Sequence, residues 1–160
     1  MPVSFQKEII LEIYSKNIAQ NSAIEGDILN QEAVVSSAKK FLGIKSEKKI
    51  FDPHSDSQVK LNSLMLETIA KPLSKKMLLD WHSILFAFSP SAKSIAIGSY
   101  RSHEEDMILT TGPIGKEKVV FIGPPSNEVN VMMKDFVQWF NKSKNSVHPV
   151  IRSGISHLYF

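Results

Sequence analysis

The amino-acid sequence predicts a mainly α-helical protein that carries one β-hairpin. Over most of the chain, apolar residues recur at the three- and four-residue spacing of amphipathic helices. One stretch, residues 89–125, instead contains short β-prone runs separated by Gly, Pro and Ser. The 160 residues, of which 42% are hydrophobic and 22% charged, have the composition of an ordinary globular protein, which excludes long disorder and collagen-like repeats.

Four helices are expected in the N-terminal half of the chain. The first runs from Phe5 to about Ala23, and Gly26 is a suitable residue to end it. The second follows Asn30, a good N-cap residue, and ends near Gly43. Residues 44–57 are polar and contain Asp52-Pro53, so they predict a surface loop.

The third helix is marked by apolar residues between Leu61 and Ile69, and it ends before Pro72. The fourth can be capped by Ser74, and its apolar stripe includes Trp81 and His82. We interpret His82 as a core histidine that is hydrogen-bonded to backbone.

The β-prone stretch and two further helices follow. Three runs favour strands, at 95–97, 107–111 and 119–122, and the last two are separated by a Gly- and Pro-containing segment that suits a hairpin turn. Ser126 can cap a long helix that extends through Phe140, and Pro149 suits the first position of a last helix.

Composition and charge exclude several classes of function. The chain has no cysteine, so disulfides, thiolate nucleophiles and Cys-based metal sites are excluded. Its net charge of +3 is mild and its basic residues are scattered, which argues against a nucleic-acid-binding protein. There is neither a secretory signal at the start nor an apolar run long enough to span a membrane. We therefore expect a cytoplasmic protein with no membrane or nucleic-acid partner.

The sequence offers few residues for catalysis. The seven glycines never form G-x-G, so the common phosphate-binding loops are excluded. The segment His103-Glu104-Glu105-Asp106 is rich in possible metal ligands, but a solvated loop is the better interpretation. His148 is expected to cap or flank the last helix, and His157 to pack or to point outward. We predict no catalytic residue and no metal site from the pattern.

One short segment, Asn21-Ser22-Ala23-Ile24-Glu25-Gly26-Asp27, does not fit a purely structural explanation. A helix end explains Gly26 as a left-handed cap. It leaves Glu25 without a role.

Several segments, taken in order, resemble the Fic family, whose members transfer AMP from ATP to a hydroxyl side chain of a target protein. Residues 22–29 resemble the family's inhibitory-helix motif, commonly S-x-x-x-E-G, although Asn21 stands where the family usually has Ser or Thr. Residues 98–101 resemble its G-x-W/Y-R segment, and residues 107–126 resemble its β-hairpin, the "flap". The other similar segments are residues 35–43, 79–86, 136–141 and 148–160.

The resemblance implies a Fic-like helical bundle with a regulatory motif and a target-binding flap. The implied regulatory residues are Asn21, Ser22, Glu25 and Gly26. In the family, the glutamate pairs with an arginine of the catalytic helix and keeps the ATP γ-phosphate from its productive position. The implied target-binding residues of the flap are Met107, Ile108, Leu109, Thr110, Thr111, Val119, Val120, Phe121 and Ile122.

The resemblance also marks a missing part. In the family, a loop with the pattern H-P-F-x-D/E-G-N-G-R carries the general base, the acidic metal ligand and the phosphate-binding backbone. The sequence reaches Phe160 before that loop, and His148-Pro149 is no substitute for it. We therefore expect an incomplete Fic fold, catalytically silent by itself, with residues 1–88 as a helical region that contains the inhibitory motif and residues 89–160 as the first part of the Fic domain.

Three hypotheses remain open. The chain is the N-terminal part of a Fic adenylyltransferase, or a non-catalytic module that supplies Glu25 or the flap to a partner chain, or an unrelated helical adaptor. ATP and Mg²⁺ are implied for the complete enzyme, and neither is expected to bind this chain tightly. The apolar face of residues 149–160 predicts a homodimer or pairing with a complementing C-terminal chain.

Overall fold

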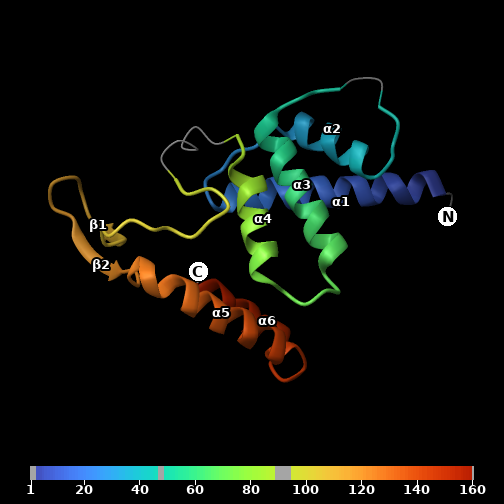
Figure 1. Cartoon of the computed structure of the whole chain (residues 1–160). Coiled ribbons are helices and arrows are strands. Elements are labelled where there is room, and N and C mark those ends of the chain that lie inside the picture. Colours follow the sequence, from blue (N-terminus) through green and yellow to red (C-terminus); the bar gives the residue numbers. More distant parts are fainter. Residues whose placement is uncertain (1–2, 47–48, 89–94, 160) are drawn as a thin grey trace. The chain divides into compact units, whose positions relative to one another are not determined.

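The computed structural model describes residues 3–46, 49–88 and 95–159 (Figure 1). These residues form six α-helices and one two-stranded antiparallel sheet, which confirms the predicted fold class. The helices are α1 (Val3–Ile24), α2 (Gln31–Phe41), α3 (Pro53–Thr68), α4 (Lys75–Phe86), α5 (Ser126–Lys142) and α6 (Pro149–Tyr159). The strands are β1 (Ile108–Thr111) and β2 (Lys118–Ile122), and a short 3₁₀ helix, η2 (Ser143–Asn145), follows α5.

The chain divides into two compact units, which we describe separately. Unit 1 consists of Met1–Lys71 and Asp80–Ser94. Unit 2 consists of Pro72–Leu79 and Ile95–Phe160. The boundary falls inside α4, so the first part of that helix belongs to unit 2 and the remainder to unit 1.

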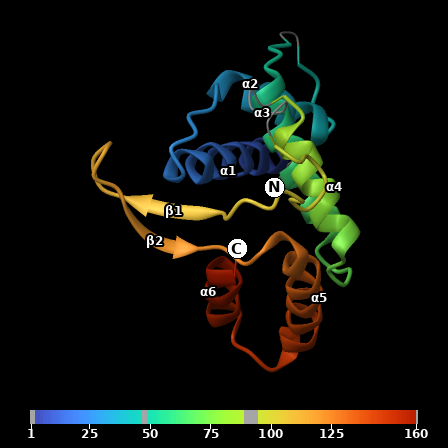
Figure 2. The same ribbon diagram turned by 60° about the vertical axis from the view of Figure 1, so that its left-hand side comes forward.

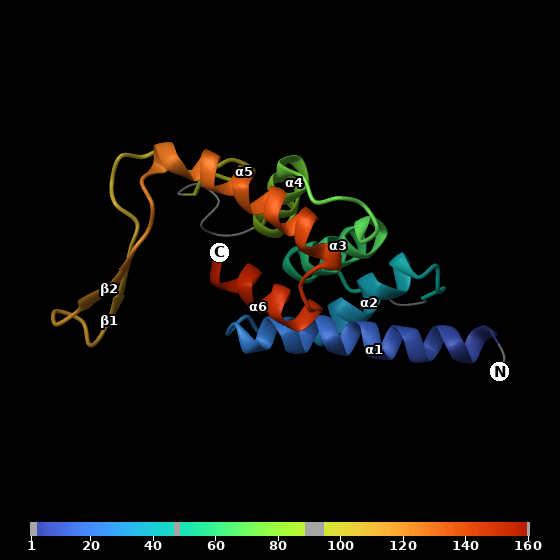
Figure 3. The same cartoon turned by 90° about the horizontal axis from the view of Figure 1, so that it is seen from below.

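The core of unit 1 lies where α1, α2 and α3 meet (Figure 3). Apolar side chains from these three helices and from the loop that joins α1 to α2 form one cluster. Its buried members are Ile18, Leu29, Val34, Ala38 and Val59. The spacing of the α2 residues follows the helical period, which is why the sequence indicated this helix clearly.

Tyr14 connects α1 to both of its neighbours. Its hydroxyl lies 2.8 Å from the Ser63 hydroxyl and donates to the Val59 carbonyl at 3.3 Å, and its ring stacks on Phe41 with centroids 5.7 Å apart. Burial raises the pKa of Tyr14 above its usual value. The side chain therefore supplies apolar contact area and also satisfies its polar end inside the unit.

Helix α3 begins earlier than the sequence predicted. The expected loop over residues 44–57 was wrong from Pro53 onward, because Asp52 is the N-cap of α3 and Pro53 occupies its first turn. The Asp52 carboxylate accepts a hydrogen bond from the Ser55 backbone N–H at 3.0 Å and another from the Ser55 hydroxyl. Asp-Pro is therefore a helix start here, which agrees with the fixed φ of proline at the first helical position.

In unit 2, α5 and α6 lie side by side and run in opposite directions (Figure 2). Phe136 of α5 is 2% exposed, and its ring stacks on Tyr159 of α6 with centroids 4.9 Å apart. The Tyr159 hydroxyl donates to the Met132 carbonyl at 2.8 Å. Arg152 lies over the Phe140 ring and donates to the Phe140 carbonyl at 2.7 Å. These contacts join the two helices at both ends of α6.

Asn141 attaches the segment before α4 to α5. Its side-chain oxygen accepts from the Leu73 N–H at 2.8 Å, and its side-chain nitrogen donates to the Leu73 carbonyl at 2.9 Å. One amide thus satisfies both backbone groups of a buried residue. The expected N-cap of α4, Ser74, accepts from the Met77 N–H at 3.2 Å, as predicted.

Two expectations in unit 2 were wrong. Residues 95–97 form no strand, because Ile108–Thr111 and Lys118–Ile122 pair with each other and no third strand of the described residues is available. Ser126 is not the N-cap of α5: the cap position is Pro125, which has no side-chain hydrogen bond, and Ser126 is the first helical residue. The two prolines before Ser126 keep the backbone extended up to the helix start.

Candidate functional site

The turn that follows α1 carries the predicted regulatory motif. The Asp27 N–H donates to the Ser22 carbonyl at 2.9 Å, and the Gly26 N–H donates to the Ala23 carbonyl at 3.0 Å. This pair of bonds is a Schellman motif, in which Gly26 occupies the position that needs a left-handed backbone. Its φ of 81° agrees with this role. Glu25 is then the C-cap residue of α1, and its position is fixed by the backbone geometry of the helix end.

The side chains of this turn differ in exposure. Ser22 is buried, whereas Asn21, Glu25 and Gly26 are exposed. Ile24 and Ile28, which flank the glutamate, are 80% and 79% exposed. The turn therefore exposes one carboxylate and two apolar side chains at the surface of unit 1.

A contact that the sequence did not indicate holds this turn to α3. Both carboxylate oxygens of Asp27 lie 2.9 Å from His54 Nε2, and Gln58 Nε2 donates to Asp27 Oδ2 at 3.4 Å. Asp27 and His54 are 27 residues apart, so no local pattern could predict the pair. The only signal was the Asp52-Pro53 helix start, which places His54 in the first turn of α3.

The predicted flap is the sheet of unit 2. Ile108 pairs with Ile122 and Leu109 with Phe121, but Thr110 pairs with Val119, so Val120 is an extra residue in a β-bulge. The turn uses Gly112 and Gly115, both with positive φ. A Cβ on Gly112 would lie 3.0 Å from the Lys116 carbonyl oxygen, which leaves glycine as the residue that fits.

All nine predicted flap residues are exposed, and the seven large apolar ones among them are each more than half exposed. Among the described residues the sheet has no third strand, so the outer backbone groups of both strands have no ladder partner. Such unpaired edges can bind an additional strand.

The base of the flap is held by close backbone contacts. The Gly123 N–H donates to the Met107 carbonyl at 2.7 Å, which extends the pairing one step beyond the strands. A Cβ on Gly123 would lie 3.3 Å from Met107, so this approach requires a small residue. Arg101 donates to the Pro124 carbonyl and so connects the segment before β1 to the segment after β2. The hairpin thus has a fixed base and exposed strands.

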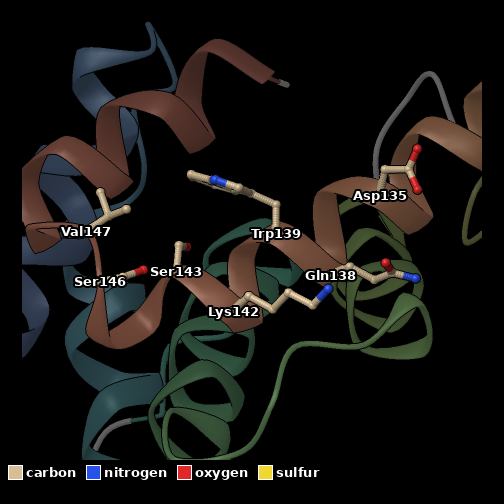
Figure 4. A pocket seen from close by; sticks show the side chains of 7 residues that line it. All are labelled: Asp135, Gln138, Trp139, Lys142, Ser143, Ser146 and Val147. Carbon is tan, nitrogen blue, oxygen red and sulfur yellow. The ribbon is translucent and has the colours of Figure 1, made fainter.

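A pocket of about 390 Å³ lies beside the C-terminal half of α5 (Figure 4). Figure 4 shows its seven lining side chains, which come from α5 and the segment that follows it: Asp135, Gln138, Trp139, Lys142, Ser143, Ser146 and Val147. One lining residue is acidic and one is basic, so the pocket favours neither anions nor cations. None of the predicted site residues lines it.

The remaining histidines were predicted to be structural or solvated. His82 is half-buried, and its ring centroid lies 4.7 Å from that of Phe86. His103 lies in an exposed loop, as expected. The Val150 N–H donates to His148 Nδ1 at 3.3 Å, which confirms that His148 caps α6, and His157 is exposed. Over the part of the chain that the structure describes, no three His, Asp or Glu side chains come together as a metal site.

The structure brings the predicted residues together in two groups. The motif at residues 21–26 forms one turn of unit 1, and the flap residues form one hairpin of unit 2. None of the helices in the described ranges has the length and apolar character needed to cross a membrane.

Part of the chain is similar to a known protein family. Residues 1–44 match a domain of unknown function, DUF4172. The matched residues contain α1, the turn with Glu25, and α2. No curated protein matches the chain.

Proposed function

We propose that the 160 residues of this sequence form the regulatory and target-binding part of a Fic-type protein adenylyltransferase. The observation that carries the proposal is the match of residues 1–44 to DUF4172, a Fic-related domain family, because those residues include the whole turn around Glu25. The exposed hairpin at residues 108–122 supports it, since a flap at this place is expected of the same family.

In this proposal Glu25 is the inhibitory residue. Its carboxylate is exposed at the end of α1 and is free to meet an arginine of the catalytic helix, as the family resemblance implies. An ion pair there would keep the γ-phosphate of ATP from the position needed for AMP transfer. The turn contributes a rigid support, because the two Schellman hydrogen bonds and Gly26 fix the backbone on which Glu25 stands.

The flap is the proposed target-binding element. A segment of the target protein would pair with a free strand edge, and its side chains would contact the exposed apolar residues of the hairpin. Backbone pairing of this kind positions a hydroxyl side chain without requiring one particular target sequence. The target would be a protein with an extended, accessible segment.

ATP and Mg²⁺ belong to the complete enzyme in this proposal. The described residues bring together no cluster of metal-ligating side chains, and the 160-residue sequence contains no H-P-F-x-D/E-G-N-G-R motif. No step of the reaction is therefore assigned to these residues. A second candidate function follows from the same two exposed elements: a non-catalytic module that supplies Glu25 or the flap to another chain.

Labelling with ATP that carries a radioactive α-phosphate tests the proposal in a protein that joins these 160 residues to a segment with the H-P-F-x-D/E-G-N-G-R loop. Replacing Glu25 by Ala is expected to raise AMP transfer roughly five- to 150-fold, the range of a typical coupling between two sites. Glu8→Ala is the matched control, because Glu8 is likewise an exposed glutamate but lies within α1, outside the turn, so its replacement is expected to leave the rate unchanged. Absence of AMP transfer in both the unaltered protein and the Glu25→Ala variant would refute the proposed adenylyltransferase function.

The non-catalytic module is tested by co-expression with a chain that carries the H-P-F-x-D/E-G-N-G-R loop. A stable complex that Val120→Lys or Glu25→Ala weakens would support the module, because both side chains are exposed and neither change should unfold the protein. Failure of the two chains to co-purify would count against it.

A further inference from the structure

The turn that bears Glu25 departs from the usual Schellman motif in one respect. An apolar contact commonly joins the residue after the left-handed glycine to the last turn of the helix. Here those two positions hold Asp27 and Ser22, which are both polar. The turn therefore lacks the apolar contact that normally completes this helix end.

Asp27 supplies a different attachment. Of residues 25–28 it is the one that is half-buried, while its three neighbours are exposed. The next buried residue along the chain is Leu29, which belongs to the core cluster of unit 1. Between the last turn of α1 and Leu29, Asp27 is thus bonded through its side chain to another helix, α3.

The partners of Asp27 both come from one face of α3. His54 and Gln58 are four residues apart, so their side chains lie one above the other on that helix. His54 Nε2 lies 2.9 Å from each carboxylate oxygen, and Gln58 adds a longer bond from one turn further along. The side chains of His54 and Asp27 are 44% and 36% exposed, so water screens the pair only in part.

We infer that His54 is a positioning residue for Glu25. By holding Asp27, it fixes the turn in which Glu25 is the C-cap residue, and it makes the orientation of that carboxylate dependent on the start of α3. The regulatory part of the inference rests on the proposed function. The attachment of the turn does not, and it is measurable in this chain alone.

Amide hydrogen exchange tests the attachment. In His54→Ala and in Asp27→Asn, the amides of Gly26 and Asp27 should exchange roughly three- to tenfold faster, which corresponds to loss of one partly exposed hydrogen-bonded contact. The amide of Val34, in the core of the same unit, should change less than about twofold. Lys16→Ala is the matched control, because it removes the exposed Glu12–Lys16 ion pair of α1 and should leave both groups of amides unchanged.

A double-mutant cycle separates direct coupling from general destabilisation. The double variant His54→Ala/Asp27→Asn should exchange no faster at Gly26 than either single variant. The inference would be overturned if the double variant accelerated exchange at Gly26 by the product of the two single-variant factors. It would also be overturned if exchange at Val34 accelerated as much as exchange at Gly26. If His54→Ala fails to fold, Gln58→Ala tests the same attachment more mildly, and unchanged exchange at Gly26 in that variant and in Asp27→Asn would also overturn it.

Activity then distinguishes this inference from the proposed function. In the protein that joins these residues to a segment with the H-P-F-x-D/E-G-N-G-R loop, His54→Ala should partially raise the rate of AMP transfer, in the same direction as Glu25→Ala. If Glu25→Ala raises the rate of AMP transfer and His54→Ala does not, the positioning role of His54 is refuted, while the proposed adenylyltransferase function stands. Absence of transfer in every variant would refute the adenylyltransferase, while the exchange data would still decide whether His54 holds the turn.

Discussion

At the scale of single residues, backbone conformation explains why the turn after α1 requires glycine at position 26. Gly26 has a φ of 81°, a conformation that other L-residues adopt only at a cost. A Cβ added there meets no atom within 4 Å, so the requirement for glycine comes from the backbone and not from crowding. Gly154 of α6 also has open space around it, but it lies inside a regular helix, so its backbone conformation does not require glycine.

The same substitution should therefore have opposite effects at these two glycines. Gly26→Ala is expected to lower the free energy of unfolding by about 1–2 kcal/mol, because alanine is strained in the left-handed region. Gly154→Ala is expected to raise it by about 0.5–1 kcal/mol, because alanine loses less conformational entropy in a helix. Urea unfolding followed by circular dichroism measures both changes. If the two substitutions changed the free energy of unfolding in the same direction, this explanation would be contradicted.

At the scale of elements, the sequence predicted correctly those helices, caps and turns that depend on residues close together in the chain. The periodicity of α2, its Asn30 cap and the position of the hairpin were all correct, because neighbouring residues determine each of them. The start of α3 was misplaced because Asp-Pro is compatible with a turn as well as with a helix start, and the choice depends on Ser55, which is fully buried.

Contacts between distant residues were outside the reach of such patterns. The Asp27–His54 pair and the Leu73–Asn141 pair join residues 27 and 68 positions apart. Neither pair has a periodic signature, since each side chain is an ordinary polar residue in its own segment. The residues of the predicted motif, 21–26, lie together in one turn, but the residue that holds this turn to α3 was found only in three dimensions.

The N-cap of α3 predicts a pH dependence. The hydrogen bonds from the Ser55 hydroxyl and backbone N–H hold the pKa of Asp52 below its usual value of 3.8. A carboxyl group whose pKa is lowered by folding stabilises the folded state above its usual pKa, and this contribution is lost as the pH falls from 3.8 through the folded-state value.

Asp52→Asn should keep the cap but remove its charge. Asp52→Asn is expected to be less stable than the unaltered protein by about 1 kcal/mol near neutral pH. The difference should shrink as the pH is lowered to about 3, where an ordinary aspartate is protonated. Urea titrations at several pH values measure it, with Asp106→Asn in an exposed loop as the control. A difference that is independent of pH would exclude the charged cap.

At the scale of the whole molecule, apolar surface is exposed in both units. In unit 2 the exposed side chains include the hairpin and one face of α6, where Ile151, Ile155 and Leu158 follow the helical spacing. The neighbouring face of α6 packs on α5 through Arg152 and Tyr159. A stripe of this kind on a helix favours association with another chain.

Sedimentation velocity over a range of concentrations should detect this association. We expect the sedimentation coefficient to rise with concentration, and Leu158→Glu, at a side chain that is 86% exposed, to abolish the rise. Ile114→Glu is the control, because Ile114 is 99% exposed at the hairpin turn and away from the α6 stripe. A single species at every concentration would refute the predicted association.

The division of the chain into two units has a practical consequence for spectroscopy. The sequence has two tryptophans: Trp81 lies in the part of α4 that belongs to unit 1, and Trp139 lies in α5 of unit 2. In a variant that keeps one of them and replaces the other by Phe, intrinsic fluorescence reports on the surroundings of the remaining indole. Each unit therefore carries its own optical probe, and stability changes at Gly26 and at Gly154 can be followed one unit at a time.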